Sequence, residues 1–396
     1  RGNAIHLCFD MLYSTSHLSN QRWILPSGLV RELPSIKNQV SRKVVFGHGI
    51  KSKGDWRMNA KKVIIDCDPG IDDALALMLA LRSPELEILG ITVVSGNVPA
   101  KKGAANAQKV LHWMNQPDIP VYLGEELPLV RPYVDAMDTH GEDGLGESHY
   151  PEITNGTINT DGVGFLARTL HEAAQKEEPV SIIALGPLTN LARLVQNDPE
   201  SLAGLGELIS MGGSCQSHGN CSPVAEYNYW CDPHAAEIVY RAFEELPVLQ
   251  DKQIHMVGLD VTRKIVLTPD ILEYMCCVNP QMGERIRNIT RFYFDFHWKQ
   301  EGIIGCVIND PLAVAYFIDR TLCSGMEACT RIATEGLCIG QSVVDRFDFW
   351  KGHKNSYILT RTSPLSFMQM FFDRVLGVPE KTSLPMLEQI MKGDVL

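Results

Sequence analysis

The sequence predicts an α/β protein with a largely parallel central sheet flanked by helices on both faces. From Met58 onward, short runs rich in β-branched residues alternate with longer segments of helical periodicity. Alternation of this kind is typical of units in which a helix connects each strand to a parallel neighbour. In open sheets of this class, ligands bind at the carboxyl ends of the strands. We therefore expect the functional residues to follow the strands directly.

The strand candidates are short, nearly continuous apolar runs, which suit strands buried on both faces of a parallel sheet. They cover residues 63–68, 87–94, 119–123, 180–185, 207–211 and 255–260. The helix candidates that alternate with them cover residues 72–82, 101–114, 161–175 and 187–197. Pro69 and Gly70 separate the first strand from the first helix, so we expect a tight turn there.

The charge balance argues against a polyanionic partner. The 396 residues carry a formal net charge of −11 and contain no basic stripe. Nucleic-acid polymers and anionic membrane surfaces attract basic proteins, so we expect neither as a partner. With 45% hydrophobic and 21% charged residues, the composition is that of an ordinary globular protein, and a small molecule is the expected ligand.

Three features predict a cytoplasmic protein. No apolar run reaches the roughly 18 residues that a membrane-spanning helix needs. The N-terminal residues also lack the pattern of a secretory signal. The 11 cysteines show no zinc-type spacing, and we expect free thiols, as in a reducing compartment.

Residues 1–57 differ from the rest of the chain. They contain nine lysine or arginine residues against three acidic residues, and they show no periodic segment of convincing length. Met58 opens the alternating pattern. We therefore expect residues 1–57 to be a basic extension that is disordered or non-native, and residues 58–396 to form a single domain.

Four aspartates crowd the junction between the first strand and the first helix: Asp66, Asp68, Asp72 and Asp73. Like charges a few Å apart repel by about 1 kcal/mol in water and by several-fold more in a partly buried site, so a cation or bound protons must balance them. The helix dipole favours acids in a first helical turn, which accounts for Asp72 or Asp73 but not for Asp68. Carboxylate oxygens suit a hard ion such as Ca²⁺ or Mg²⁺ rather than Zn²⁺.

Polar residues also follow other predicted strands, where an apolar core would not select them. They are Asn97, the segment 184–190, Asn220, Glu226, Asn228 and Asp310. Each alone has an ordinary explanation as a turn residue or a helix cap. Together they place carboxylates and amides on one edge of the sheet. Such an edge suits a polyhydroxylated ligand with a metal ion at its centre.

At this point the chain resembles the nucleoside hydrolases of the inosine–uridine preferring type, which include bacterial ribonucleoside hydrolases. The aspartate-rich fingerprint of that family stands here as DCDPGIDDA, residues 66–74. Further family blocks follow in the right order: VVSGN (93–97), THGEDGLG (139–146), ALGPLTNLA (184–192), MGGS (211–214), GNCSPVAEYN (219–228) and NDPLAV (309–314). The resemblance covers about residues 61 to 380, and it implies a Rossmann-like open α/β fold.

The resemblance implies one Ca²⁺ per subunit and a reaction at the sugar. The implied metal ligands are the carboxylates of Asp68, Asp73 and Asp310 and the backbone carbonyl of Leu185. A Ca²⁺-bound water, activated by Asp68 as general base with Asp66 in support, would hydrolyse the N-glycosidic bond of a ribonucleoside to free base and ribose. The family resemblance also implies a homodimer or homotetramer.

The resemblance assigns the remaining polar residues to the ribose. Asp72, Asn97 and Asn228 would hold the 2′- and 3′-hydroxyls. Asn220 and Glu226 would hold the 5′-hydroxyl, near the Met211 side chain. Anionic surroundings of this kind suit the oxocarbenium-like sugar that forms when an N-glycosidic bond breaks.

One position departs from the family pattern. Many purine-cleaving members carry His directly before the last metal aspartate, whereas this chain has Asn309, which cannot donate a proton as a general acid. His140 matches another family histidine near the base and is the candidate acid. His297, in the aromatic segment 291–300, is a weaker candidate that we expect to be a partly exposed helix residue. The base preference therefore stays open.

Two other functions fit parts of the sequence. Haloacid-dehalogenase-type phosphatases also place Asp-x-Asp after a buried strand, but their motif continues with Thr or Val, whereas Pro69 follows here. A non-catalytic nucleoside- or sugar-binding protein on the same fold is the second alternative, and Asn309 favours it. Release of free base from a nucleoside would separate hydrolysis from both alternatives.

Overall fold

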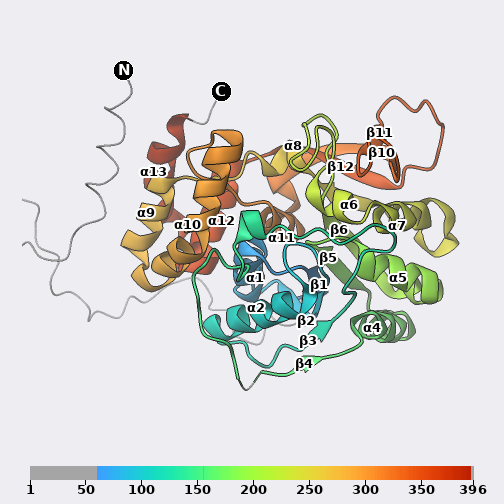
Figure 1. Cartoon of the computed structure of the whole chain (residues 1–396), viewed down its shortest axis with the longest axis horizontal. Coiled ribbons are helices and arrows are strands. Elements are labelled where there is room, and N and C mark those ends of the chain that lie inside the picture. Colours follow the sequence, from blue (N-terminus) through green and yellow to red (C-terminus); the bar gives the residue numbers. More distant parts are fainter. Residues whose placement is uncertain (1–59, 155, 394–396) are drawn as a thin grey trace, which may run out of the picture. The chain divides into compact units, whose positions relative to one another are not determined.

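The computed structural model describes residues 60–154 and 156–393. Its centre is a ten-stranded sheet with the order β11-β10-β12-β7-β6-β5-β1-β2-β3-β4 (Figure 1). Neighbouring strands run parallel except at β10, which is antiparallel to both β11 and β12. This arrangement confirms the predicted α/β fold with a largely parallel sheet. The expected basic extension, residues 1–57, lies outside the described residues.

The strands of the large sheet are β1 (Lys61–Cys67), β2 (Leu86–Val93), β3 (Val121–Leu123), β4 (Ile158–Asn159), β5 (Val180–Ala184), β6 (Leu205–Met211), β7 (Ile254–Val257), β10 (Cys323–Ile332), β11 (Ser342–Asp345) and β12 (Ser356–Thr362). A separate antiparallel pair consists of β8 (Val266–Leu267) and β9 (Cys306–Val307).

The helices are α1 (Ile71–Leu81), α2 (Ala100–Trp113), α3 (Met137–His140), α4 (Gly162–Lys176), α5 (Thr189–Asn197), α6 (Tyr227–Cys231), α7 (Pro233–Glu245), α8 (Leu259–Thr262), α9 (Pro269–Val278), α10 (Pro280–Glu301), α11 (Asp310–Ile318), α12 (Pro364–Leu376) and α13 (Glu380–Ile390). None of the helices in the described ranges is both long enough and apolar enough to cross a membrane.

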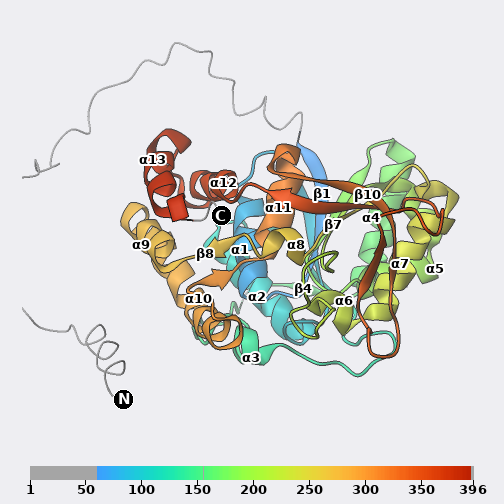
Figure 2. The ribbon, with the colours of Figure 1, turned by 90° about the horizontal axis from the view of Figure 1, so that it is seen from above.

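Helices cover both faces of the sheet because successive strand residues point to opposite sides. On β1, Val63 and Ile65 pack into a core with α1, α2, α11 and α12, whereas Ile64 packs into a second core with α4, α5 and α7. Figure 2 shows these helices on the two sides of the strands, and α9, α10 and α13 lie beyond the first group. A parallel strand buried on both faces reads as a continuous apolar run, which is why the sequence pattern located β1 and β5.

The predicted strands and helices are all present, with boundaries that differ by a few residues. The largest difference concerns the strand predicted at 255–260, which ends at Val257. Gly258 caps the short helix α8, so Asp260 belongs to a helix rather than to a strand. The apolar run continues across this boundary, and periodicity alone cannot place a four-residue helix.

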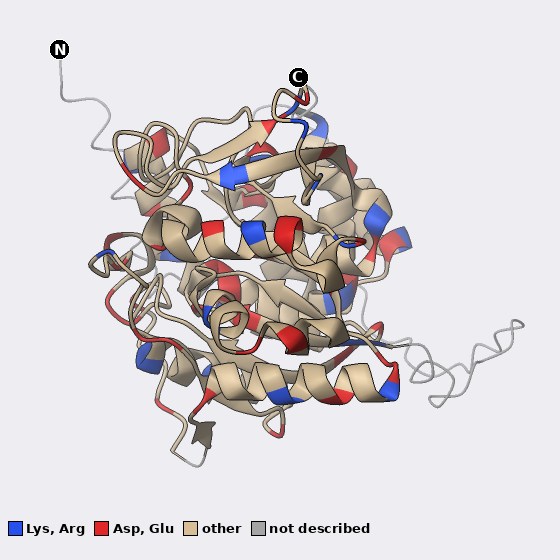
Figure 3. Ribbon diagram, turned by 90° about the vertical axis from the view of Figure 1, so that its right-hand side faces the viewer, with Lys and Arg blue, Asp and Glu red and all other residues tan. Residues whose placement is uncertain are grey.

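Two further features concern composition. Lysine and arginine residues alternate with aspartate and glutamate along the helices of the face drawn in Figure 3, so charges of both signs are mixed there. Ten cysteines lie in the described part of the chain, and all ten carry free thiols, as the sequence predicted.

Candidate active site

A cavity of about 340 Å³ lies at the carboxyl edge of the sheet. It is bordered by residues that follow β2, β5 and β6, together with parts of α3, α6 and α10 and the start of α11. Most of the residues that the sequence singled out line it: Asp72, Asn97, His140, Leu185, Met211, Asn220, Glu226, Asn228, His297, Asn309 and Asp310. Asp66, Asp68 and Asp73 are fully buried and do not belong to the lining.

The aspartate-rich turn is organised by Asp73. Strand β1 ends at Cys67, and α1 begins at Ile71, so Asp68 lies just past the strand and Asp73 lies in the first helical turn. The Asp73 carboxylate accepts hydrogen bonds from the backbone N–H groups of Asp68 (3.2 Å) and Gly70 (3.0 Å). Such bonds satisfy backbone donors that the start of a helix leaves free. The expected structural role of an acid in this turn is therefore confirmed for Asp73.

The two carboxylate oxygens of Asp68 differ in their hydrogen bonding. Its Oδ2 accepts a hydrogen bond from the backbone N–H of Asn97 at 2.6 Å, while its buried Oδ1 has no hydrogen-bond partner among the described residues. Two glycines make room for this carboxylate. A Cβ on Gly96 would lie 1.9 Å from Asp68 Oδ2, and a Cβ on Gly186 would lie 2.6 Å from Oδ1. Any side chain at either glycine would displace Asp68.

Asp66 lies on β1 and is also completely buried. Its Oδ1 accepts hydrogen bonds from the Thr92 hydroxyl and from Asn190 Nδ2, at 2.7 Å for Asn190. Its Oδ2 has no partner in the described residues. Burial raises the pKa of Asp66 to about 6.

A second group of carboxylates could hold a metal ion. Ligand atoms of Asp72, Asp73 and Asp310 all lie within 4.8 Å of one another, and all three residues are buried. The sequence had named Asp68 in place of Asp72, and the geometry adds Asp72 to this group. Asp72 and Asp310 line the cavity, and so does Leu185, whose backbone carbonyl is one of the implied metal ligands.

The five aspartates form a site of uncompensated negative charge. Within residues 60–154 and 156–393, no salt bridge joins Asp66, Asp68, Asp72, Asp73 or Asp310 to a basic side chain. Burial, reinforced by the neighbouring carboxylates, raises the pKa of Asp73 to about 6 and raises the pKa values of Asp68 and Asp310 well above their usual range. Clustered oxygen ligands, two unpartnered buried oxygens and no basic counter-charge fit a hard divalent cation.

The opposite wall is built around Glu226, which caps α6. Its carboxylate accepts hydrogen bonds from the N–H groups of Gly213 (2.9 Å), Asn228 (2.9 Å) and Tyr229 (3.2 Å). Burial nevertheless raises the pKa of Glu226 to about 7. Asn228 Nδ2 donates to the Leu185 carbonyl at 2.7 Å, so that one of the four implied metal ligands is already oriented by a side-chain amide.

Two buried histidines in the lining are fixed in opposite tautomers. The N–H of Ile71 donates to His140 Nδ1 at 3.0 Å, so the proton of neutral His140 resides on Nε2. His297 Nδ1 lies 2.9 Å from the Tyr293 carbonyl, which can only accept, so neutral His297 leaves Nε2 as an acceptor. Burial lowers the pKa of both rings. His297 is 4% exposed, so the expectation of a partly exposed helix residue was wrong.

Asn309 supports Asp72 rather than standing free. Its backbone N–H and its Nδ2 both lie 3.2 Å from Asp72 Oδ2 as donors. The Tyr293 hydroxyl contacts the same carboxylate oxygen at 3.5 Å. Asn309 therefore positions an acid of the metal group, a role that sequence reasoning did not assign.

Sequence reasoning missed the remaining lining residues of α10 and Arg263. Tyr293 and His297 are four residues apart on one helix face, as are Phe296 and Gln300, and all four line the cavity. This i, i+4 spacing of aromatic and polar residues was a usable signal. Nothing in the sequence marked Arg263, because it follows a helix that the apolar pattern had concealed.

Comparison with known proteins identifies the family. The sequence pattern of the inosine-uridine preferring nucleoside hydrolases matches residues 63–369. The pyrimidine-specific ribonucleoside hydrolase RihA of Escherichia coli K12 is 33% identical over 318 residues, which cover 80% of this chain and 98% of that protein.

Solved structures agree with this result. The plant nucleoside hydrolase PpNRh1 superimposes with a TM-score of 0.73 at 30% identity, over 80% of this chain and 98% of that one. The purine-preferring ribonucleoside hydrolase of Gardnerella vaginalis superimposes with a TM-score of 0.73 at 28% identity and the same coverage. With the fold and the aspartate-rich edge described above, these matches show that the chain belongs to the inosine-uridine preferring nucleoside hydrolase family.

Proposed function

We propose that the chain hydrolyses the N-glycosidic bond of ribonucleosides with Asp68 as general base and one Ca²⁺ beside it, and that it cleaves pyrimidine nucleosides at least as well as inosine. The activity itself is that of the family. The observation that carries the mechanism is the buried aspartate cluster beside the cavity, in which Asp68 Oδ1 has no partner among the described residues.

The cation would be held by Asp68, Asp73 and Asp310 and the Leu185 carbonyl, with Asp72 close by. These residues offer oxygen ligands only, and their positions at the carboxyl edge of β1 and β5 and at the start of α11 are set by the sheet. When bound, Ca²⁺ would supply a positive charge that orients the attacking water and the sugar diol. The chain's own residues carry out the proton transfer and hold the sugar.

Asp68 suits the role of general base because its position is fixed and one oxygen is available. The Asn97 N–H holds Oδ2, and Gly96 and Gly186 leave no spare volume around the carboxylate. A fixed base costs little reorganisation when it accepts a proton. Burial and the neighbouring carboxylates of Asp73 and Asp72 raise the pKa of Asp68, which favours its protonated form after transfer.

The ribose would lie between the aspartates and the Glu226 wall. Asp72, Asn97 and Asn228 border the part nearest the metal group, and Asn220 and Glu226 border the part assigned to the 5′-hydroxyl. As the bond to the base breaks, positive charge develops on the sugar. The surrounding carboxylates stabilise that charge without moving.

The base would lie against α10 and α3. Neutral His140 can donate a hydrogen bond through Nε2, and His297 can accept one through its own Nε2. Asn309 cannot protonate the base, because an amide is not an acid, and its backbone N–H and Nδ2 both donate to Asp72. Uracil leaves as a delocalised anion that needs a donor more than a strong acid, which supports cleavage of uridine. The pyrimidine-specific activity in the name of the Escherichia coli relative supports the same preference.

The test is release of free base from uridine and inosine in Ca²⁺ buffer. Hydrolysis gives uracil or hypoxanthine together with ribose. A phosphatase would instead release phosphate from a nucleotide, and a binding protein would saturate with nucleoside and release nothing. Binding without base release would therefore disprove the proposed activity.

Removal of the metal should have a pH-dependent effect on stability. The pKa values of Asp66 and Asp73 are about 6 in the folded chain, above the ordinary value of about 4, so the folded state binds the extra protons. Without metal, these groups therefore favour folding most below pH 4, and this contribution is lost as the pH rises through 6. Bound Ca²⁺ should offset that loss.

We expect addition of Ca²⁺ to EDTA-treated protein to raise Tm more at pH 7 than at pH 5, and to restore activity at pH 7. Differential scanning calorimetry at both pH values measures the first effect, with NaCl at equal ionic strength as the control. The same increase in Tm at both pH values would contradict a metal held by these carboxylates.

We also propose that the enzyme works in the cytoplasm as a homodimer or homotetramer, as the family resemblance implies. Light scattering coupled to size-exclusion chromatography should give two or four times the 44.1 kDa chain mass. A single chain mass at micromolar concentration would contradict the oligomer.

A further inference from the structure

Helix α8 places two opposite charges against one loop. Asp260 lies within α8, and Arg263 lies directly after it. The loop between β6 and α6 passes both. Residues 215–217 of this loop donate their N–H groups to Asp260, and residues 217–219 offer one hydroxyl and two carbonyl oxygens to Arg263. One short element therefore holds consecutive parts of the loop.

The contacts of Asp260 are all with backbone donors. Its Oδ2 accepts from the N–H of Cys215 at 2.7 Å, and its Oδ1 accepts from the N–H groups of Gln216 (2.7 Å) and Ser217 (3.1 Å). Three hydrogen bonds from one carboxylate satisfy donors that an irregular loop cannot pair within itself.

Arg263 holds the next residues and reaches beyond the loop. Its Nη1 donates to Ser217 Oγ and to the His218 carbonyl, both at 2.6 Å, and its Nη2 donates to the Gly219 carbonyl at 3.0 Å. The same Nη2 lies 3.5 Å from Glu301 at the end of α10, and both side chains are mostly shielded, with 16% and 21% exposed. A planar guanidinium can serve two partners in fixed directions at once.

The two segments that Arg263 joins both contribute residues to the lining of the cavity. The loop continues directly into Asn220, which lines the end assigned to the 5′-hydroxyl. The last turns of α10 carry His297 and Gln300, which line the end assigned to the base. Arg263 also lines the cavity, and its donors are directed at protein atoms.

We propose that Arg263 is a positioning residue that couples the 5′-hydroxyl end of the cavity to the base end, with Asp260 fixing the loop from its other side. This inference rests on the proposed nucleoside hydrolysis. Without the guanidinium, residues 217–219 lose three hydrogen bonds. The position of Asn220 relative to α10 is then no longer fixed. Recognition of the 5′-hydroxyl then weakens, while the aspartate cluster and its chemistry stay in place.

The experiment compares uridine with 5′-deoxyuridine in Arg263→Ala. We expect kcat/KM for uridine to fall about tenfold, mainly through KM, which corresponds to the loss of about 1.4 kcal/mol of binding. The value for 5′-deoxyuridine should change little, because this substrate lacks the group that the loop positions. Arg263→Lys should recover part of the discrimination, and Asp260→Asn should lose part of it.

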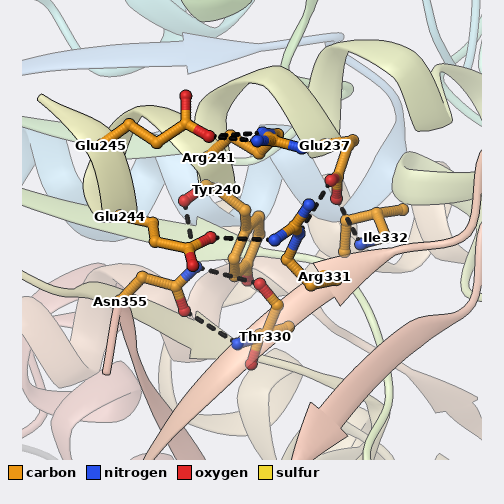
Figure 4. A network of polar contacts seen from close by, with 9 residues as sticks. All are labelled: Glu237, Tyr240, Arg241, Glu244, Glu245, Thr330, Arg331, Ile332 and Asn355. Atoms are coloured by element: carbon orange, nitrogen blue, oxygen red, sulfur yellow. Dashed lines mark hydrogen bonds and ion pairs between the residues drawn. The ribbon is translucent and has the colours of Figure 1, made fainter. Parts of the chain in front are cut away.

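Arg331 provides the matched control. It is also a partly buried arginine, and it forms ion pairs with Glu237 (2.9 Å) and Glu244 (3.0 Å) (Figure 4). These ion pairs join β10 to α7, and Arg331 does not line the cavity. Arg331→Ala should lower Tm and leave the ratio of the two substrates unchanged. A purely structural Arg263 would behave in the same way.

The outcomes are separable from those of the proposed function. If wild-type protein releases no base from either substrate, the proposed function fails. If wild-type protein is active and Arg263→Ala lowers kcat/KM for both substrates by the same factor, the coupling inference is overturned. If Arg263→Ala does not fold, the ratio of kcat/KM for uridine to that for 5′-deoxyuridine in Asp260→Asn and Arg263→Lys tests the inference instead.

Discussion

Asp68→Asn should lower kcat for uridine by about 100-fold or more, because it removes both a general base and a ligand charge. The same change should raise the Tm of metal-free protein, since it removes one of several buried like charges that no basic group balances. Loss of activity and gain of stability in one variant is a combination that misfolding cannot produce. Steady-state kinetics and calorimetry in EDTA measure the two effects.

Asp232→Asn is the control for this experiment. Asp232 is also fully buried, but its carboxylate accepts from Leu129 N–H, the Thr189 hydroxyl and Ala235 N–H, and it does not line the cavity. We expect Asp232→Asn to lower the Tm. At temperatures below that Tm, its kcat should equal that of the wild type. Full turnover by Asp68→Asn in metal-free buffer would eliminate the mechanism.

Asn309→His should raise kcat/KM for inosine relative to uridine by about tenfold or more. This factor is smaller than the rate enhancement that a well-positioned general acid typically gives. A purine leaves more readily once a ring nitrogen is protonated, whereas uracil delocalises its negative charge onto carbonyl oxygens. In the wild type the Asn309 amide contacts Asp72 and the Tyr293 hydroxyl, and an amide cannot act as a general acid. Initial rates with both nucleosides give the ratio.

His140→Ala identifies any acid that already exists. His140 is buried with a lowered pKa, so it should act as a hydrogen-bond donor to both bases, and its removal should reduce both activities. His171→Ala, a partly exposed histidine bonded to Asp198, serves as the control. If wild-type enzyme strongly prefers inosine and His140→Ala abolishes only that activity, then His140 is the acid and Asn309 does not decide the preference.

The edge of the sheet where the candidate site lies could be predicted from the sequence, whereas the packing of α10 over that edge could not. Asp68, Asn97 and Leu185 follow strands whose apolar runs are legible, and parallel strands bring their carboxyl ends to one edge whatever the helices do. The positions of these residues at the ends of predicted strands were therefore enough to group them. What the pattern could not show was that Asp72 brings a ligand atom within 4.8 Å of those of Asp73 and Asp310.

The base end depends on how a long helix packs over that edge. The segment 291–300 predicted a surface position for His297 because it is rich in charged residues, but the packing of α10 against the rest of the domain buries this side chain. Arg263 was hidden for a different reason. The strand predicted at 255–260 ends early, and a helix of four residues leaves no periodicity to detect.

The construction of the cavity also bears on how this kind of enzyme can diversify. The groups assigned to the ribose come from several loops and helix starts that follow strands of the central sheet, whereas Phe296, His297 and Gln300 all lie on the single helix α10. Exchanging these three side chains changes no residue of the aspartate cluster. The base preference can therefore change between related proteins while the hydrolytic residues stay the same. This fits the names of similar proteins, one pyrimidine-specific and another purine-preferring.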